Sequence, residues 1–154
     1  MTTTSAGPAT AAYQELATIL RGELITPGDP GYDSARAVYN AMIDKRPAAI
    51  ARCRDAADVI SCVRFAREHG VEIAVRGGGH NAGGLGVADG ALVIDLSQMR
   101  STTVDPENHT VRADPGCTWS DVDHATVAFG MATPCGFLAS TGVAGLTLGV
   151  ASAT

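Results

Sequence analysis

Three short apolar segments in the middle of the chain have the composition of buried strands. They are residues 49–54 (AIARCR), 71–76 (VEIAVR) and 91–96 (ALVIDL), and the last is apolar almost throughout. Apolar runs of about four to eight residues are consistent with strands buried on both faces. We therefore predict one strand in each segment.

A helix is predicted between the first two of these strands. Asp55 is a favoured N-cap residue, Asp58 would add negative charge to the first turn, and Gly70 suits the turn that ends many helices. The apolar side chains between these ends recur at the i, i+3, i+4, i+7 spacing of one helical face. They are Val59, Cys62, Val63 and Ala66.

Two strands and a second helix are predicted after residue 100. Residues 102–114 have strand-like segments on either side of D-P-E-N at 105–108, where proline stands at the position that a type I turn favours. Thr118 suits the start of a helix, with Asp121 in the first turn and Gly130 after the end. Residues 133–154 show little periodicity and many small side chains, and no element is assigned to them.

The first 39 residues are predicted to precede the folded domain. Residues 1–10 are rich in Thr, Ser, Ala, Gly and Pro, a composition typical of disorder. A short helix closed by Gly22 is predicted over residues 13–22, and residues 26–33 have the composition of a turn-rich connector. The order of the later elements, namely strand, helix, strand, long loop, strands and helix, indicates an α+β fold.

Composition and charge exclude some classes of partner. With 154 residues, of which 45% are hydrophobic, the chain can form one domain with a core. The net charge of −5 argues against nucleic acid, because proteins that bind a phosphate backbone present a basic face. No apolar run reaches the roughly 18 residues of a membrane-spanning helix. The first residues also lack the basic and apolar regions of a secretory signal.

The cysteines indicate reduced thiols rather than a metal or redox centre. None of the four forms a C-x-x-C pair, which argues against a zinc ribbon or a thioredoxin-like site. No histidine has a metal partner at ligand spacing, so we expect no metal. We expect a cytoplasmic protein in which each cysteine behaves as a small buried hydrophobic residue. These cysteines are Cys53, Cys62, Cys117 and Cys135.

The stretch VRGGGHNAGGLGVADG at residues 75–90 places one histidine in a glycine-rich loop. A first hypothesis is a nicotinamide-dinucleotide loop, because Gly77, Gly79 and Ala82 fit G-x-G-x-x-A after a predicted strand. In that motif the loop opens a helix whose N-terminus holds the pyrophosphate. Residues 83–90 contain four more glycines, each of which costs about 1 kcal/mol inside a helix. The context therefore disfavours this hypothesis.

A second hypothesis is a flavin site. Successive N–H groups of residues 77–79 could form an anion nest for a pyrophosphate. Arg76 could add positive charge there, or it could be a solvated residue at the end of the strand. A neutral imidazole is a nucleophile. His80 could therefore form a covalent bond to a ring methyl of an isoalloxazine.

Four motifs in the same order resemble the FAD-binding domain of FAD-linked oxidases. They are RGGGH at 76–80, ALVIDLSQM at 91–99, VRADPGCTW at 111–119 and STGVAGLTLG at 140–149. The resemblance covers about residues 40–149. It is to the vanillyl-alcohol-oxidase or PCMH type, in particular the bacterial berberine-bridge-enzyme-like branch. It implies an α+β fold, the N-terminal part of a two-subdomain FAD-binding domain.

The resemblance also implies a cofactor, a reaction and a set of site residues. The cofactor would be FAD, and a small-molecule substrate would transfer hydride from a C–H bond to flavin N5. The glycines Gly77, Gly78 and Gly79 would hold the pyrophosphate, with Arg76 and Asn81 beside them. His80 would carry the covalent link to the flavin 8α carbon. A second segment would run along the phosphates and the isoalloxazine edge, with Pro134 near the ring. Its residues are Ser140, Thr141, Gly142 and Gly145.

Some members of this family carry a second flavin link from a cysteine. That cysteine lies four residues before the glycine of the G-V-x-G segment, which is Gly142 in this chain. The matching position here is Leu138, and Cys135 stands three residues earlier. We therefore expect one covalent link at most, through His80.

The resemblance predicts a truncated chain. Residues 1–39 would be a start and connector, and residues 40–154 an incomplete FAD-binding domain, with a first subdomain at about 40–99 and a partial second one at about 100–149. Relatives continue G-L-T-L-G-G-G-I-G-Y-L and add a C-terminal substrate domain with the catalytic residues. Deleting one nucleotide from a coding sequence for G-G-G-I-G-Y-L yields G-V-A-S-A-T, the sequence of residues 149–154. Sequencing the gene beyond the stop codon tests this frameshift hypothesis.

Three classes of function therefore stand as hypotheses. The first is an FAD-dependent oxidoreductase, of which this chain would be an inactive fragment. The second is an NAD(P)-binding enzyme of the Rossmann type, and the third is a non-catalytic binding module. Tight binding of FAD without binding of NAD would separate the first from the second. Binding of neither would favour the module or a fragment that does not build its site.

Overall fold

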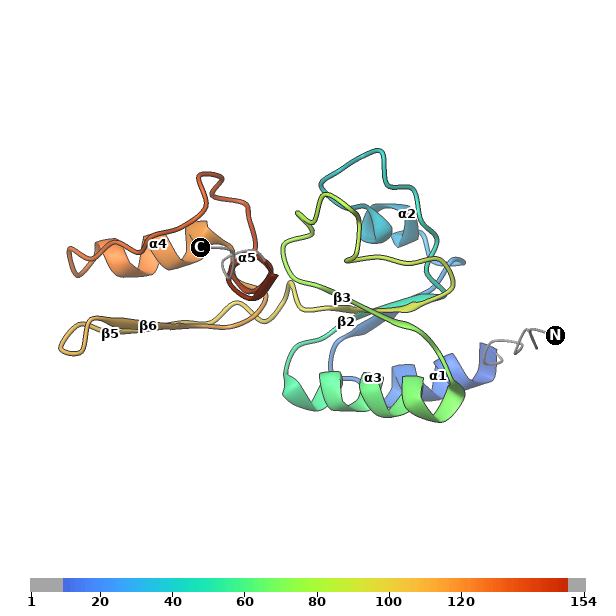
Figure 1. Ribbon diagram of the computed structural model, residues 1–154. Helices are drawn as coiled ribbons and strands as arrows, with labels where there is room; N and C mark the ends of the chain where they lie inside the picture. Colours follow the sequence, from blue (N-terminus) through green and yellow to red (C-terminus); the bar gives the residue numbers. More distant parts are fainter. Residues whose placement is uncertain (1–9, 150–154) are drawn as a thin grey trace.

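A four-stranded sheet forms the centre of the larger part of the molecule (Figure 1). The structure, a computed structural model, describes residues 10–149. The strands are β1 (Glu23–Ile25), β2 (Ala49–Arg52), β3 (Ile73–Arg76) and β4 (Leu92–Asp95), in the order β1-β2-β4-β3. β2 and β3 pair in parallel with β4, and β1 pairs antiparallel with β2. The three strands predicted from apolar segments are confirmed.

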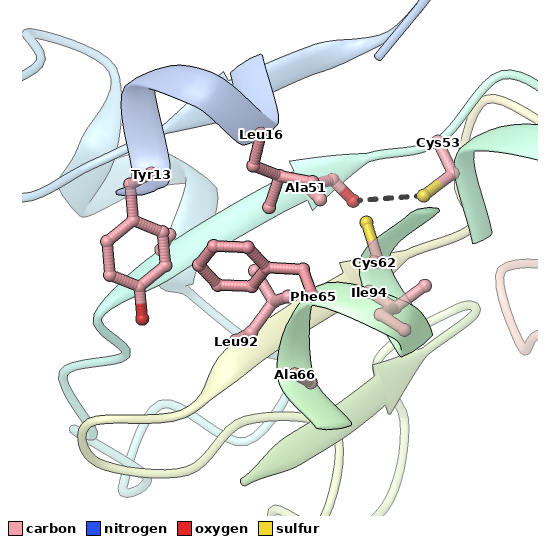
Figure 2. Packing of buried hydrophobic residues seen from close by; sticks show 10 residues of the cluster. Tyr13, Leu16, Ala51, Cys53, Cys62, Phe65, Ala66, Leu92 and Ile94 are labelled. Atoms are coloured by element: carbon pink, nitrogen blue, oxygen red, sulfur yellow. Dashed lines mark hydrogen bonds between the residues drawn. The ribbon is translucent and has the colours of Figure 1, made fainter. Parts of the chain in front are cut away.

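Two helices cover one face of this sheet. They are α1 (Thr10–Ile19) and α3 (Ala56–His69), and both lie below the sheet in Figure 1. Figure 2 shows their side chains packed against those of β2 and β4. The buried cluster contains Leu16 from α1, Cys62 and Phe65 from α3, and Leu92 and Ile94 from β4. The first predicted helix begins earlier than expected, and α1 ends before Gly22.

The second face of the sheet is covered by a short helix and by loops. The helix is α2 (Tyr32–Arg36). It begins inside residues 26–33, which were predicted to be a connector, and ends after them. Tyr32 and Ala35 pack there against Ile50 and Val93, and the Tyr32 hydroxyl donates to the carbonyl of Pro47 at 2.7 Å. Because α1 packs on one face of the sheet, α2 packs on the other and β1 pairs with β2, the folded unit begins well before residue 40, the predicted start of the domain.

A hairpin and two helices form the smaller part of the molecule. The strands β5 (Thr102–Asp105) and β6 (Thr110–Ala113) pair antiparallel, as predicted around the D-P-E-N turn. α4 (Trp119–Val127) lies along this hairpin, and α5 (Val143–Gly149) lies where the two parts of the molecule meet (Figure 1). The sequence pattern did not predict α5, and none of its described side chains is buried.

The predicted caps of α3 and α4 are confirmed. The Asp55 carboxylate accepts from the N–H groups of Ala57 and Asp58, and Gly70 ends α3 in the left-handed conformation with φ of 65°. In α4, the Asp121 carboxylate accepts from both the backbone N–H and the hydroxyl of Thr118. One detail of the α3 stripe is wrong, because Val63 is 44% exposed, and Phe65 lies in the core instead.

Within residues 10–149, no helix is both long and apolar enough to span a membrane. Two predictions fall on residues that the structure does not describe. The first is the disorder predicted for residues 1–10, of which only Thr10 is described, at the start of α1. The second is the departure from the family pattern after Gly149.

Candidate cofactor-binding site

A cavity of about 250 Å³ opens where the two parts of the molecule meet. The end of β3 and the glycine loop form one wall, through residues 75–81 and residues 85 and 86. The opposite wall comes from the segment around the start of α5. It consists of Thr141, Gly142, Gly145 and Leu146. Ligand pockets commonly measure about 300–1,000 Å³, so this cavity lies just below the usual range of volumes.

Glycine is required where the two walls meet. A β-carbon on Gly78 would lie 2.7 Å from the α-carbon of Gly142, and one on Gly142 would lie 2.9 Å from the α-carbon of Gly78. Gly79 adopts φ of 71°, a conformation that strains any residue with a side chain. The run of glycines therefore keeps the loop in place and lets its backbone line the cavity.

The backbone of the glycine loop offers free hydrogen-bond donors. In the described part of the chain, the N–H groups of residues 77–81 donate to no backbone oxygen. A buried or half-buried N–H group without an acceptor is uncommon in a folded protein. Several such groups beside one cavity suit an anion such as a pyrophosphate, which accepts hydrogen bonds from successive N–H groups.

His80 lines the same cavity and is held by two contacts. Its Nε2 lies 3.1 Å from the hydroxyl oxygen of Ser140, which comes from the opposite wall. Its ring stacks on Tyr39, with ring centroids 4.0 Å apart and planes inclined by 19°. The Tyr39 backbone N–H also donates to the carbonyl of Gly79 at 3.1 Å. Sequence reasoning missed Tyr39, because it lies before the region of resemblance. Its separation of 41 positions from His80 gives no sequence signal of contact.

A comparison with known protein families identifies this arrangement. The sequence profile described as "FAD binding domain" matches residues 47–154, which include both walls of the cavity. The chain belongs to this FAD-binding family. The resemblance drawn from the four sequence motifs is therefore confirmed, and FAD is the cofactor of the family.

Individual members of this family support the assignment. The chain is 38% identical over 129 residues to (R)-6-hydroxynicotine oxidase of Paenarthrobacter nicotinovorans, covering 84% of this chain and 28% of the relative. The solved structure of BBE-like 1 from Physcomitrella patens superposes with a TM-score of 0.83 at 27% identity, covering 89% of this chain and 30% of that one. Glucooligosaccharide oxidase from Acremonium strictum gives a TM-score of 0.81 at 27% identity, with 90% and 30% covered.

These relatives confirm the predicted fold, an α+β architecture matching part of the PCMH-type FAD-binding domain. The chain spans less than a third of the length of each relative named above. The FAD assignment also agrees with the loop itself, since no helix lies between β3 and β4. A nicotinamide loop of the G-x-G-x-x-A type would have opened one.

Arg76 does not have the surroundings that either sequence interpretation gave it. The side chain is only 7% exposed, so it is not a solvated residue at the end of the strand. Its guanidinium pairs with Asp95 at 2.8 Å and donates to the carbonyls of Ala35 and Ala37 at 2.6 and 3.3 Å. Arg76 is also one of the residues that line the cavity. In this FAD-binding domain Arg76 thus fixes the end of β3 to β4 and α2, and its charge is already compensated.

Asn81 organises the loop on the far side of His80. Its side-chain oxygen accepts from the N–H of Leu85 at 3.1 Å, and its carbonyl accepts from Gly84 at 3.0 Å. Asn40 adds a bond from its side-chain amide to the carbonyl of Ala82 at 3.1 Å. These bonds give the residues after His80 a defined path, so the loop is held at both ends.

Only some residues of the second predicted segment line the cavity. Thr141, Gly142 and Gly145 line it, and Ser140 reaches it through His80. Pro134 and Cys135 are exposed, and neither contributes to the cavity wall. The structure therefore places the start of α5, rather than the segment around Pro134, beside the glycine loop.

Proposed function

We propose that this chain is the FAD-binding portion of an FAD-dependent oxidoreductase and that it holds the cofactor covalently through His80. When bound, FAD supplies the chemistry by accepting hydride from a substrate C–H bond at flavin N5. The observation that supports this proposal is the single cavity wall that combines the free N–H groups of residues 77–81 with the imidazole of His80.

The residues of the chain divide this task between them. The glycine-loop N–H groups bind the anionic diphosphate, and the close approach of Gly78 and Gly142 excludes side chains from the path of the cofactor. His80 provides the nucleophilic nitrogen. One link is expected, since Cys135 lies outside the cavity wall.

Two of the relatives point to the class of substrate. One is named a hydroxynicotine oxidase and another a glucooligosaccharide oxidase, and the solved structure of the latter is described with a 6-S-cysteinyl, 8α-N1-histidyl FAD. We propose a small organic molecule as the substrate of the whole protein. The residues that would select it and act as catalytic base belong to the part of the relatives that this chain does not span.

The covalent link provides a direct test. The chain is produced with added riboflavin, precipitated in acid, and examined for flavin absorbance that stays with the protein. We expect the wild type and His124→Ala, an exposed site on α4, to retain flavin, and His80→Ala to lose it. Retention of flavin by His80→Ala would refute the link. Absence of flavin from the wild type, together with no binding of added FAD, would refute the binding function.

A further inference from the structure

Residues 39–46 run beside the glycine loop and are bonded to it at both ends. The Tyr39 backbone N–H donates to the carbonyl of Gly79 at 3.1 Å. At the other end of the segment, the Arg46 backbone N–H donates to the Asp89 carboxylate at 2.6 Å. The backbone of Tyr39 therefore has a defined position relative to the cavity wall that this loop forms.

The Tyr39 side chain lies on the imidazole of His80 although little of it is buried. The two ring centroids are 4.0 Å apart, and the two planes are inclined by 19°. Tyr39 is nevertheless 65% exposed, so burial in a core does not hold its ring in place. The backbone bond to the glycine loop and the stack itself hold it there. An exposed aromatic ring placed over one polar ring of the cavity wall points to a role in the site.

The imidazole needs such a neighbour because its own torsion sets the plane of the ring only weakly. The terminal torsion of a histidine side chain has broad, roughly two-fold minima, so contacts decide the orientation of the ring. Ser140 contacts the edge of the His80 ring, with its hydroxyl oxygen 3.1 Å from Nε2. One contact at the edge leaves the ring free to tilt about that point. The stack with Tyr39 fixes the plane, and the two contacts together define the orientation.

We infer that Tyr39 is a positioning residue for the covalent attachment of FAD, because it holds the plane of the His80 imidazole in the cavity. This inference rests on the proposed function and adds to it a residue that acts through His80. In the attachment step, a bond forms between an imidazole nitrogen and the 8α carbon of the flavin, and one C–H bond of that methyl group breaks. The two electrons of the C–H bond pass through the isoalloxazine to dioxygen. The hydrogen peroxide that forms takes up two protons, one from the methyl group and one from the imidazole.

The aromatic face of Tyr39 also suits the change of charge in this step. The imidazole carries a positive charge from the moment its nitrogen bonds to carbon until its N–H proton leaves. A cation within about 6 Å of the centre of an aromatic ring is attracted by the negative face of that ring. The stack, at 4.0 Å, lies well within this distance. Phenylalanine offers the same kind of face and leucine offers none, so Tyr39→Phe and Tyr39→Leu form a matched pair of variants.

The stack can be measured by NMR before any flavin is present. Protons above an aromatic face are shielded, so the carbon-bound ring protons of His80 should resonate upfield of those of a solvated histidine. Loss of these signals in His80→Ala assigns them. We expect the upfield shift in the wild type, in Tyr39→Phe and in the control Met42→Ala, at a 90% exposed position of the same segment. In Tyr39→Leu, the signals should move to the positions of a solvated histidine.

The rate of FAD attachment gives the second readout. Apo chain is mixed with saturating FAD, so that a change in affinity does not alter the rate, and the acid-stable flavin is followed over time. We expect attachment in Tyr39→Leu to be about 10-fold slower or more, because the imidazole is no longer held in the reacting orientation. Tyr39→Phe and Met42→Ala should attach FAD at the wild-type rate.

Three results would overturn the inference. Unshifted His80 signals in the wild type would show that the stack does not form in solution. Attachment in Tyr39→Leu as fast as in the wild type, or in Tyr39→Phe as slow as in Tyr39→Leu, would show that the aromatic ring does not position the imidazole. A wild type that forms no bond would refute the proposed covalent link itself, and the role of Tyr39 with it, even where the shifts show the stack.

Discussion

Gly78 of the glycine loop and Gly142 before α5 pack backbone against backbone. A β-carbon on either residue would collide with the backbone of the other, within 2.9 Å of its α-carbon. These glycines are 64 positions apart in the chain, and their contact joins the two walls of the cavity. The width of the site therefore depends on the absence of two side chains.

A substitution of Gly78 by alanine tests this relationship. We expect Gly78→Ala to push the walls apart and to weaken FAD binding by at least about tenfold, since backbone on both sides cannot yield as a flexible side chain can. Gly28→Ala is the matched control, because a β-carbon at Gly28 meets nothing within 4 Å. FAD affinity is measured by titration of flavin fluorescence. Equal affinities in the two variants would mean that the contact does not shape the site.

The ion pair between Arg76 and Asp95 predicts a loss of stability rather than a simple loss of phosphate binding. Both side chains are buried, and Asp95 also accepts from the N–H of Ser97 at 3.0 Å. Removing one partner of a buried pair typically costs about 3–5 kcal/mol. Arg52, whose Nε lies 3.8 Å from the same carboxylate, compensates part of the charge left on Asp95, so the loss falls near the lower end of this range. We expect this loss for Arg76→Gln in urea unfolding, and partial recovery in Arg76→Gln with Asp95→Asn. A double variant no more stable than the single one would show that the two charges are not coupled.

Asp58 ties α3 to two other backbone segments and should be among the positions most sensitive to substitution. Its carboxylate accepts from the N–H groups of Arg21, Gly22 and Arg54 at 2.8, 3.0 and 2.9 Å. An amide at this position replaces one acceptor oxygen by a donor that faces N–H groups. We expect Asp58→Asn to lower the free energy of unfolding by about 3 kcal/mol. Glu68→Gln, at an exposed site on the same helix, should change it little.

Much of the fold could be predicted from the sequence because its signals are local. Asp55 and Gly70 mark the ends of α3 through bonds and backbone angles within a few residues. The strands β2, β3 and β4 are recognisable because the sheet is covered on both faces. By contrast, β1 has only three residues and depends on pairing with β2, and α2 depends on packing of Tyr32 and Ala35 against the far face. These contacts form only in the folded chain and leave no local pattern in the sequence.

The candidate site also contains some features that the sequence predicts and others that depend on packing in the folded chain. The glycine loop and His80 were found because their residue types are unusual together, and the resemblance to a family supplied the second segment. The buried pairing of Arg76 could not be predicted, because its partner Asp95 lies on another strand and the carbonyls on α2. The stack of Tyr39 on His80 likewise joins residues that only the packing of the loop brings together.

The link between Arg100 and α4 predicts a stability that depends on pH. Arg100 donates to both carboxylate oxygens of Asp121, at 2.6 and 3.1 Å, and the same carboxylate accepts from Thr118. Burial raises the pKa of Asp121, but the hydrogen bonds from Arg100 and Thr118 outweigh it and hold this pKa below its ordinary value of 3.8. The folded state therefore favours the ionised carboxylate.

This contribution to stability is complete above the pKa of the unfolded chain, about 4, and is lost as the pH falls through the lower pKa of the folded state. We expect Asp121→Asn to lower the free energy of unfolding at pH 7 by about 1–2 kcal/mol, as for loss of a helix cap with a charged partner. The difference between the variant and the wild type should shrink as the pH falls below about 4. Urea unfolding across this range measures it, with Asp123→Asn, exposed on the same helix, as the control. A difference that stays constant with pH would show that the carboxylate acts through its shape and not through its charge.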